Sequence, residues 1–283
     1  MTALTFVGIG AIGLPMAIQL HRAGYEVTGI DAAVRARERA ASAGLTGAAR
    51  ITDAARSDAV IVMVATPEHL ATLVDQAGDT VHGQIWVIMS TVGPDAIRSQ
   101  SGLLIAAGAR VVDAPVTGGV ARAQTGELVI FASGEAAAIQ EVTPILEALG
   151  TVRVVGDRVG TGQSVKIVNQ HLCSIHIVAA AEALSLADSL GLDRAFALDL
   201  VSGGAAGSWM LSDRGLRMLG DTDVPVMSTI NIFVKDSGLV ASAAVASGAQ
   251  VPLLKAAEER YHLAADAGLG VRDDSRVIET YVR

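Results

Sequence analysis

The sequence predicts an α/β protein with a doubly wound N-terminal sheet, followed by an all-α C-terminal domain that a long interdomain helix joins to it. Short apolar runs alternate with helical stretches up to about residue 155, and a glycine-rich turn follows the first run. No convincing strand follows Gly160. With 283 residues the chain exceeds a typical single domain. We therefore predict two domains, residues 1–160 and residues 161–283.

The composition narrows the class of protein. The net charge is −8 and the isoelectric point is about 5.2, which argues against a nucleic-acid partner because few basic groups would neutralise phosphates. The single cysteine excludes an internal disulfide framework. A strand beginning by Leu4 leaves no room for a signal peptide, and charges or turn residues interrupt every long apolar run. We expect a soluble cytoplasmic protein without a membrane partner.

The elements follow from the apolar pattern in order. We expect strands at Leu4–Val7, Glu26–Ile30, Val60–Val64, Ile85–Met89, Arg110–Ala114, Leu128–Ala132 and Val152–Val155. A helix with Pro15 in its first turn should end at Gly24, and another should run from about Glu135 to Leu149. The interdomain helix should span Gly162–Leu190, about 43 Å of helix, with Gly191 as its stop. Later helices are expected at Ala195–Val201, Met210–Gly220, Phe233–Ala246 and Pro252–Ala267, with a short one near Asp273–Ile278.

The turn after the first strand is typical of a dinucleotide site. It reads Gly8-Ile9-Gly10-Ala11-Ile12-Gly13, and it lies between a strand and a helix. In a Rossmann fold the first glycine makes the tight turn, the second admits the pyrophosphate and the third allows close helix–strand packing. Asp31 closes the next strand, where it would bind the ribose hydroxyls and select NAD over NADP. The predicted cofactor-binding residues are Gly8, Gly10, Ala11, Ile12, Gly13 and Asp31. An ordinary α/β turn with a solvated aspartate is the alternative.

Two further loops leave the carboxyl ends of strands, where ligands bind in doubly wound sheets. Ala65 and Thr66 follow one strand, and Thr91 follows the next, near the expected nicotinamide end. Either loop, taken alone, also fits a simple turn into a helix before Pro67 or Pro94.

The loop Pro115–Gly119 suits an anion such as a substrate carboxylate. Gly118 and Gly119 leave backbone N–H groups accessible, and Thr117 adds a hydroxyl. An ordinary glycine-rich turn is the alternative.

Lys166 is the candidate general base for hydride-transfer chemistry. It lies near the start of the long helix, where the positive end of the dipole and partial burial would lower its pKa. Gln170 follows four residues later on the same face and could hold the substrate. Position alone also fits a solvated surface lysine, and Lys235-Asp236 also fits an exposed charge pair. The six histidines are scattered, so no metal site is expected.

Four segments together resemble the β-hydroxyacid dehydrogenases, which include 3-hydroxyisobutyrate dehydrogenase and tartronate semialdehyde reductase. The segments are Gly8–Gly13, Asp113–Gly119, Gly160–Gln170 and Phe233–Asp236, and the resemblance covers nearly the whole chain. It implies that Lys166 is the catalytic lysine and that Lys235 lies near cofactor and substrate. It also implies that Thr117, Gly118 and Gly119 bind the substrate.

This chain departs from the family pattern at two positions. Thr117 stands where the family usually has Ser, and Gln170 stands where it usually has Asn. Asn169-Gln170, Gly207–Met210 and Asp273–Ser275 look most like the L-threonate dehydrogenase branch, whose members oxidise four-carbon acid sugars with NAD.

The predicted function is therefore NAD-dependent oxidation of a small hydroxycarboxylic acid, with residues 1–160 binding NAD and residues 161–283 serving substrate binding and oligomerisation. The Ala-rich helical half predicts a homodimer or homotetramer. The alternatives are 3-hydroxyisobutyrate dehydrogenase or tartronate semialdehyde reductase activity, or a non-catalytic dinucleotide-binding module. An imine reductase of the same architecture resembles this chain less, because such enzymes usually have another residue at the position of Lys166.

Overall fold

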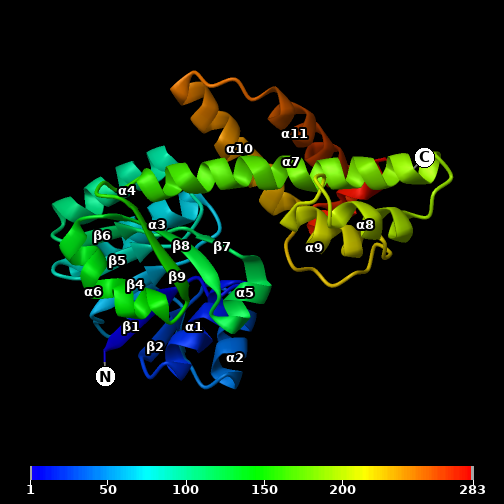
Figure 1. The fold of residues 1–283 in the computed structure, drawn as a ribbon. Helices are drawn as coiled ribbons and strands as arrows, with labels where there is room; N and C mark the ends of the chain where they lie inside the picture. The colour runs from blue at the N-terminus through cyan, green and yellow to red at the C-terminus, as the bar shows by residue number, and fades with distance from the viewer. Residues whose placement is uncertain (1, 282–283) are drawn as a thin grey trace. The chain divides into compact units, whose positions relative to one another are not determined.

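A computed structural model describes residues 2–281. The chain divides into two compact units, Met1–Lys166 and Ile167–Arg283. The division falls inside helix α7 (Thr161–Ser189), whose first turns belong to the first unit. Figure 1 traces the chain through these elements.

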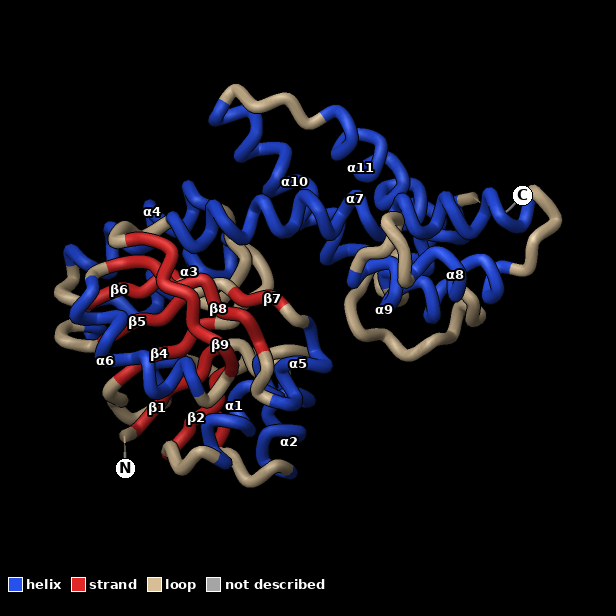
Figure 2. Tube along the Cα trace, in the orientation of Figure 1, coloured by secondary structure: helices blue, strands red, loops and turns tan. Residues whose placement is uncertain are grey.

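The first unit is built on one sheet of nine strands (Figure 2). These are β1 (Ala3–Val7), β2 (Glu26–Ile30), β3 (Thr46–Ala48), β4 (Ala59–Val62), β5 (Ile85–Ile88), β6 (Arg110–Asp113), β7 (Val116–Thr117), β8 (Leu128–Gly134) and β9 (Gly150–Gly156). The order β3-β2-β1-β4-β5-β6 is parallel throughout and is the strand order of a Rossmann fold. Strand β8 joins β6 and β7 antiparallel, and β9 extends β8 in parallel.

Helices cover both faces of this sheet. They are α1 (Gly13–Arg22), α2 (Val34–Ser42), α3 (Pro67–Ala77), α4 (Pro94–Ala106), α5 (Gly119–Thr125) and α6 (Ala136–Glu147). Strand β5 shows the layering, because Ile85 and Val87 join the core under α1 and α6 while Trp86 and Ile88 join the core under α3 and α4. An apolar run with both faces covered is the pattern of a central parallel strand. The predicted fold class is confirmed.

Several elements of the first unit have no counterpart in the sequence prediction. Helix α2 is Arg- and Ala-rich and mostly exposed, so its apolar face is narrow. Strand β3 has three residues and β7 has two, which are too few to show alternation. The stretch Pro115–Gly119, expected as an anion-binding loop, contains the short strand β7, and α5 begins at its last residue.

The second unit consists of helices and the loops that connect them, and among its described residues one isolated antiparallel bridge joins Thr229 to Asp273. It contains the rest of α7, α8 (Arg194–Ser202), α9 (Trp209–Met218), α10 (Ile230–Ser247) and α11 (Pro252–Ala264). A π-helix (Ala265–Leu269) and a 3₁₀ segment (Asp274–Thr280) end it. Ile177, Leu184, Phe233 and Tyr261 form part of its core, and the rings of Phe233 and Tyr261 stack with centroids 5.3 Å apart.

Helices α7 and α10 are long and apolar enough to cross a membrane by length and composition alone. That criterion admits up to two charged residues in the window, so it does not contradict the expectation that charges interrupt every long apolar run. Both helices nevertheless contribute side chains to the core of the second unit, such as Ile177 and Ala181 from α7 and Ile230 from α10. A helix in the core of a globular protein passes the same test of length and composition.

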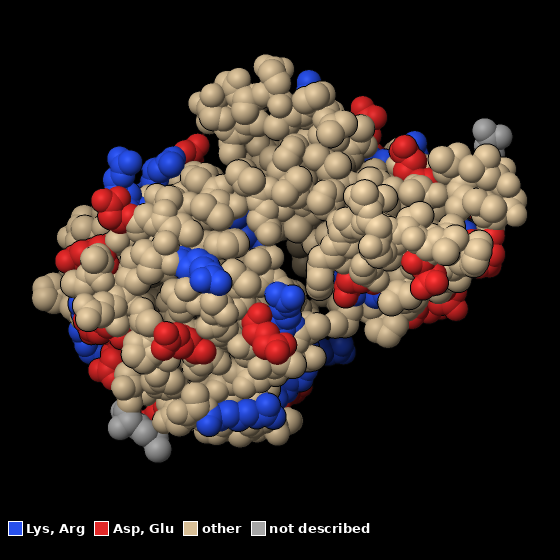
Figure 3. Space-filling model, viewed as in Figure 1, with Lys and Arg blue, Asp and Glu red and all other residues tan. Residues whose placement is uncertain are grey.

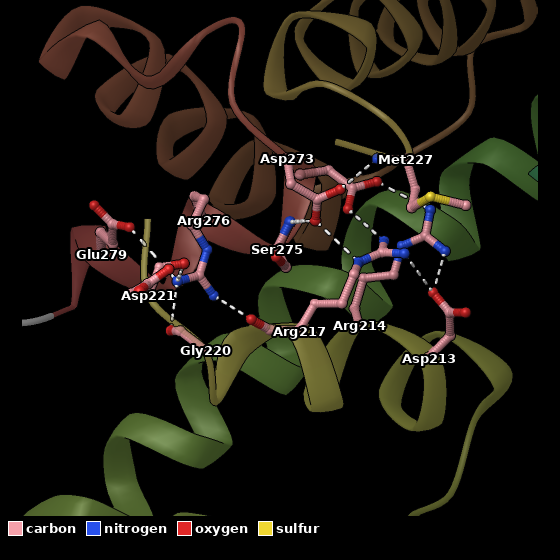
Figure 4. A network of polar contacts seen from close by, with 11 residues as sticks. Asp213, Arg214, Arg217, Gly220, Asp221, Met227, Asp273, Ser275, Arg276 and Glu279 are labelled. Carbon is pink, nitrogen blue, oxygen red and sulfur yellow. Dashed lines mark hydrogen bonds and ion pairs between the residues drawn. The ribbon is translucent and has the colours of Figure 1, made fainter. Parts of the chain in front are cut away.

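A charged network ties the C-terminal segment to α9 (Figure 4). The fully buried Asp274 lies 3.0 Å from the Arg214 guanidinium and 3.2 Å from that of Arg217. Its neighbour Asp273 lies 3.0 Å from Arg217 and accepts a hydrogen bond from the Met227 N–H. Asp273 and Asp274, which belong to a segment that resembles the L-threonate dehydrogenase branch, are therefore each paired with an arginine of α9.

Candidate active site

The glycine loop has the shape that a pyrophosphate requires. A Cβ at Gly8 would lie 2.3 Å from the Met63 carbonyl oxygen, and a Cβ at Gly13 would lie 1.9 Å from the Gly8 carbonyl oxygen. A Cβ at Gly10 would meet no protein atom within 4 Å. Gly8 and Gly13 are therefore required by packing, whereas Gly10 leaves an open approach to the backbone.

The start of α1 and the end of β2 complete a dinucleotide site. No side chain caps the N-terminus of α1, which begins at Gly13, so this end of the helix is available for phosphate oxygens. Asp31 directly follows β2 and is half-buried, and its Oδ1 accepts a hydrogen bond from the Ala33 N–H at 2.9 Å. These residues fit NAD: α1 could hold its phosphates, and Asp31 could accept hydrogen bonds from its ribose hydroxyls.

The loops after β4 and β5 lie at the same edge of the sheet. Thr66 caps α3, because its Oγ1 accepts a hydrogen bond from the His69 N–H at 3.2 Å. Its hydroxyl is therefore engaged in holding the helix. Thr91 stands one residue after Ser90, whose carbonyl oxygen is held by the side chain of Gln163 at 2.9 Å.

The predicted carboxylate-binding residues surround the start of α5. Thr117 ends β7, opposite Val129 of β8. Gly118 and Gly119 follow with backbone φ values of 132° and 66°, which residues other than glycine rarely adopt. A Cβ at Gly119 would meet nothing within 4 Å, so its backbone is open to a ligand.

Lys166 is only 6% exposed, so it is not a solvated surface lysine. It lies on α7, three residues after the fully buried Gln163. The carboxylate of Asp113, at the end of β6, accepts hydrogen bonds from the N–H groups of Gly160 and Gln163 at 2.9 and 3.0 Å. Burial raises the pKa of Asp113, although the hydrogen bonds from Gln163, Gly160 and Ser133 oppose this shift.

In the second unit, Gln170 and Lys235 converge on one buried carboxylate. The Gln170 Nε2 donates to Asp236 Oδ2, and the Lys235 Nζ lies 2.8 Å from Asp236 Oδ1 as an ion pair. The Asn169 side chain donates to Gln170 Oε1 at 2.8 Å. Asp236 is only 3% exposed, so Lys235-Asp236 is not an exposed charge pair. Both predicted substrate-binding residues of this unit thus share one partner.

Asp113, Ser133, Gln163 and Asp236 had no predicted functional role from the sequence. Asp113 was quoted only as the start of a family segment, although a carboxylate at the end of a buried strand needs partners. Gln163 had a sequence signal in its place between Gly162 and Lys166. Ser133 gave none, because its hydrogen bond to Asp113 joins positions 20 residues apart.

Figure 3 shows one face of the molecule. On that face basic and acidic side chains are interspersed over the first unit. Within residues 2–281, no group of three or more His, Cys, Asp or Glu side chains gathers as a metal site would require.

Two family models together match nearly the whole chain. The NAD-binding domain of 6-phosphogluconate dehydrogenase matches residues 3–160. A domain described as the NAD-binding domain of NADP-dependent 3-hydroxyisobutyrate dehydrogenase matches residues 160–281.

Individual relatives agree with these models. An L-threonate dehydrogenase of Escherichia coli O6:H1 is 35% identical, over 97% of this chain and 93% of its own. A 2-hydroxy-3-oxopropionate reductase of Escherichia coli K12 is 31% identical, over 98% of this chain and 96% of its own. A crystal structure of 3-hydroxyisobutyrate dehydrogenase from Salmonella typhimurium superposes with a TM-score of 0.91 at 33% identity, covering 99% of this chain and 100% of that one.

The chain belongs to the β-hydroxyacid dehydrogenase family, as its four motifs indicated. It is an NAD-dependent dehydrogenase that acts on a small hydroxy acid.

Proposed function

We propose that this enzyme oxidises a four-carbon acid sugar such as L-threonate, with Lys166 as the general base. The observation that carries the base assignment is the burial of Lys166 near the start of α7. The relatives named L-threonate dehydrogenase, at 32–35% identity over almost their full length, support the substrate class.

In this proposal the substrate is held through its carboxylate and its hydroxyls. The backbone at Gly118 and Gly119 and the hydroxyl of Thr117 bind the carboxylate. Gln170 and Lys235 contact the polyhydroxy part of the substrate. Bound NAD supplies the acceptor for a hydride.

Lys166 completes the oxidation by removing the hydroxyl proton. As the C–H bond breaks and its electron pair leaves as hydride, the O–H bond gives its proton to Lys166 Nζ, and the carbon becomes a carbonyl. The amine must be neutral to accept this proton.

The deciding experiment measures NADH formation with a panel of C3 to C6 hydroxy acids. L-Threonate should give the highest kcat/KM, and Lys166→Ala should lower kcat by at least about 10²-fold with that substrate. Near-normal turnover by Lys166→Ala would show that Lys166 is not the general base. Failure of every hydroxy acid, despite a melting temperature raised by NAD, would favour a non-catalytic dinucleotide-binding module.

The second candidate activity is that of 3-hydroxyisobutyrate dehydrogenase or 2-hydroxy-3-oxopropionate (tartronate semialdehyde) reductase. The relatives that bear those names favour it, since both align over nearly the full chain. A higher kcat/KM for 3-hydroxyisobutyrate, or for 2-hydroxy-3-oxopropionate with NADH, would establish it over L-threonate.

The proposed role of Asp31 is tested with NADP. A carboxylate beside the ribose would repel a 2′-phosphate, so kcat/KM should be lower with NADP than with NAD. Asp31→Ser should raise the NADP to NAD ratio of kcat/KM by at least about tenfold, since it removes a negative charge. Equal use of both cofactors by the parent enzyme would argue against this role.

We also propose that the enzyme is a homodimer or homotetramer and that it is cytoplasmic. Large apolar side chains stand exposed on α7 and α8, among them Leu186, Phe196 and Leu200. A monomeric sedimentation profile would refute the oligomer. A soluble NAD-dependent enzyme with a single cysteine suits the reducing cytoplasm.

A further inference from the structure

Gln163 uses the full hydrogen-bonding capacity of its carboxamide inside the first unit. Its Oε1 accepts from the N–H groups of Val92 and Gly93, each at 3.0 Å. Its Nε2 donates to the Ser90 carbonyl oxygen at 2.9 Å and to Asp113 Oδ1 at 3.1 Å. Two donors and two acceptor sites are thus satisfied, so the orientation of the amide is fixed.

Asp113 holds the same end of α7 from the neighbouring strand. Its Oδ2 accepts from the N–H groups of Gly160 and Gln163 and from the Ser133 hydroxyl, the last at 3.2 Å. Gly160 directly precedes α7 and has no side chain to cap the helix. Asp113 therefore supplies, from β6, the negative cap that the start of a helix favours.

Close packing leaves this helix start little freedom. A Cβ at Gly162 would lie 2.4 Å from the Phe131 carbonyl oxygen and 3.0 Å from the Asp113 carbonyl oxygen. The Gly162 N–H also donates to the Ser133 hydroxyl at 2.9 Å. The first turn of α7 is thus pressed against β6 and β8.

These contacts join three parts of the proposed site. The loop held by Gln163 contains Thr91, and the strand that ends at Asp113 leads into Thr117–Gly119. Lys166 lies three residues after Gln163, about 4.5 Å further along the helix axis. A shift or rotation of the first turn would therefore move the lysine relative to both loops.

We propose that Gln163, anchored by Asp113, is a positioning residue that sets the place of Lys166 relative to the loops after β5 and β6. This inference rests on the proposed role of Lys166 as the base. The effect is large in principle, since a misplacement of about 1 Å can lower a rate by about 10²-fold.

The test compares Gln163→Met with Gln84→Met. Methionine keeps the length of the side chain and removes its hydrogen bonds. Gln84 is the matched control: it is 7% exposed and donates through Nε2 to the Ser57 carbonyl oxygen at 3.0 Å, but it precedes β5, at the opposite edge of the sheet.

Both variants should lower the melting temperature, because each leaves buried polar groups without partners. Gln163→Met alone should lower kcat by about 10²-fold while KM for NAD stays within about threefold. It should also move the midpoint of the pH profile of kcat/KM. Gln84→Met should keep the parental kcat and pH profile.

Gln163→Glu provides a second readout that also serves if Gln163→Met does not fold. One carboxylate oxygen can still accept from Val92 and Gly93, but the other faces two acceptors, the Ser90 carbonyl and Asp113 Oδ1. A proton must then be bound between these oxygens. The ratio of the kcat of this variant to that of the parent should fall as the pH rises.

Two outcomes would overturn the inference. The first is a parental kcat and pH profile in Gln163→Met together with a lowered melting temperature. The second is a Gln163→Glu to parent ratio that does not change with pH. If Lys166→Ala is inactive while Gln163→Met turns over normally, only this inference fails. If Lys166→Ala turns over normally, the proposed function itself fails.

Discussion

Gln170 donates a hydrogen bond through its Nε2 to Oδ2 of Asp236, a residue of α10 that is 66 positions further along the chain. The same carboxylate lies 2.8 Å from the Lys235 ammonium. The resemblance implied an Asn at this position, and the longer side chain of Gln170 reaches this carboxylate. Gln170 and Lys235 therefore hold one buried carboxylate together.

Shortening this side chain should change substrate preference. Gln170→Asn removes one methylene, so the amide should lose Asp236 and leave the carboxylate with a weaker set of partners. We expect kcat/KM for a four-carbon acid sugar to fall by at least about tenfold relative to a three-carbon hydroxy acid. Steady-state kinetics with both substrates measure this ratio. The substitution Gln250→Asn, at an exposed position, serves as the control. An unchanged ratio in Gln170→Asn would show that Gln170 does not determine substrate preference.

The three glycines of the dinucleotide loop should fail in different ways. Gly13→Ala should lower the melting temperature sharply, because its Cβ would lie 1.9 Å from the Gly8 carbonyl oxygen. Gly10→Ala should keep the parental melting temperature and weaken NAD binding by at least about tenfold, because its methyl group would occupy the open approach to the backbone. Thermal melts and NAD titrations separate the two effects. If Gly10→Ala kept the parental affinity for NAD, the pyrophosphate would not bind against the backbone at Gly10.

Asp113 should contribute a pH-dependent part of the stability of the first unit. Burial raises its pKa above the ordinary value of 3.8, so the folded chain binds this proton more tightly than the unfolded chain. The contribution is fully present below the ordinary value and is lost as the pH rises through the raised folded value. Asp113→Asn does not titrate, so it does not lose this stability as the pH rises. Its changed hydrogen bonds alter the free energy of unfolding by an amount that does not depend on pH.

Melting temperatures of Asp113→Asn and the parent, measured in parallel from pH 4 to pH 8, test this sign. The difference between variant and parent should move in favour of the variant as the pH rises. A difference that moves the other way would mean that the hydrogen bonds outweigh burial and that the folded pKa is lowered.

The network around Asp274 should be a major source of stability in the second unit. Asp274→Ala would leave the buried Arg214 with Asp213 alone and the half-buried Arg217 with Asp213 and Asp273, at a cost of about 3 kcal/mol, the low end for a broken buried pair. The control is Asp223→Ala, which breaks a 2.7 Å ion pair with Arg272 whose two side chains are 81% and 45% exposed. That change should cost at most about 1 kcal/mol. Urea unfolding of both variants measures the difference, and equal losses would deny the network its role.

The sequence by itself determined the fold class, the cofactor and the family. Apolar runs such as Val60–Val64 are local signals, and the glycine loop carries its own turn chemistry, so both can be read without tertiary contacts. The long helix was predicted at Gly162–Leu190 and forms at Thr161–Ser189, since no proline interrupts the run and Gly191 follows its end. The short elements β3 and β7 escaped detection, because two or three residues show no period.

Only the tertiary structure decided which polar side chains are buried together. Spacing alone left Lys166 open to a surface position and Lys235-Asp236 open to an exposed pair, because burial depends on what distant segments cover. The partners of Gln163 lie 50 to 73 residues away in sequence. No periodicity encodes such pairings, since each depends on where the sheet brings the ends of β5 and β6 beside the first turn of α7.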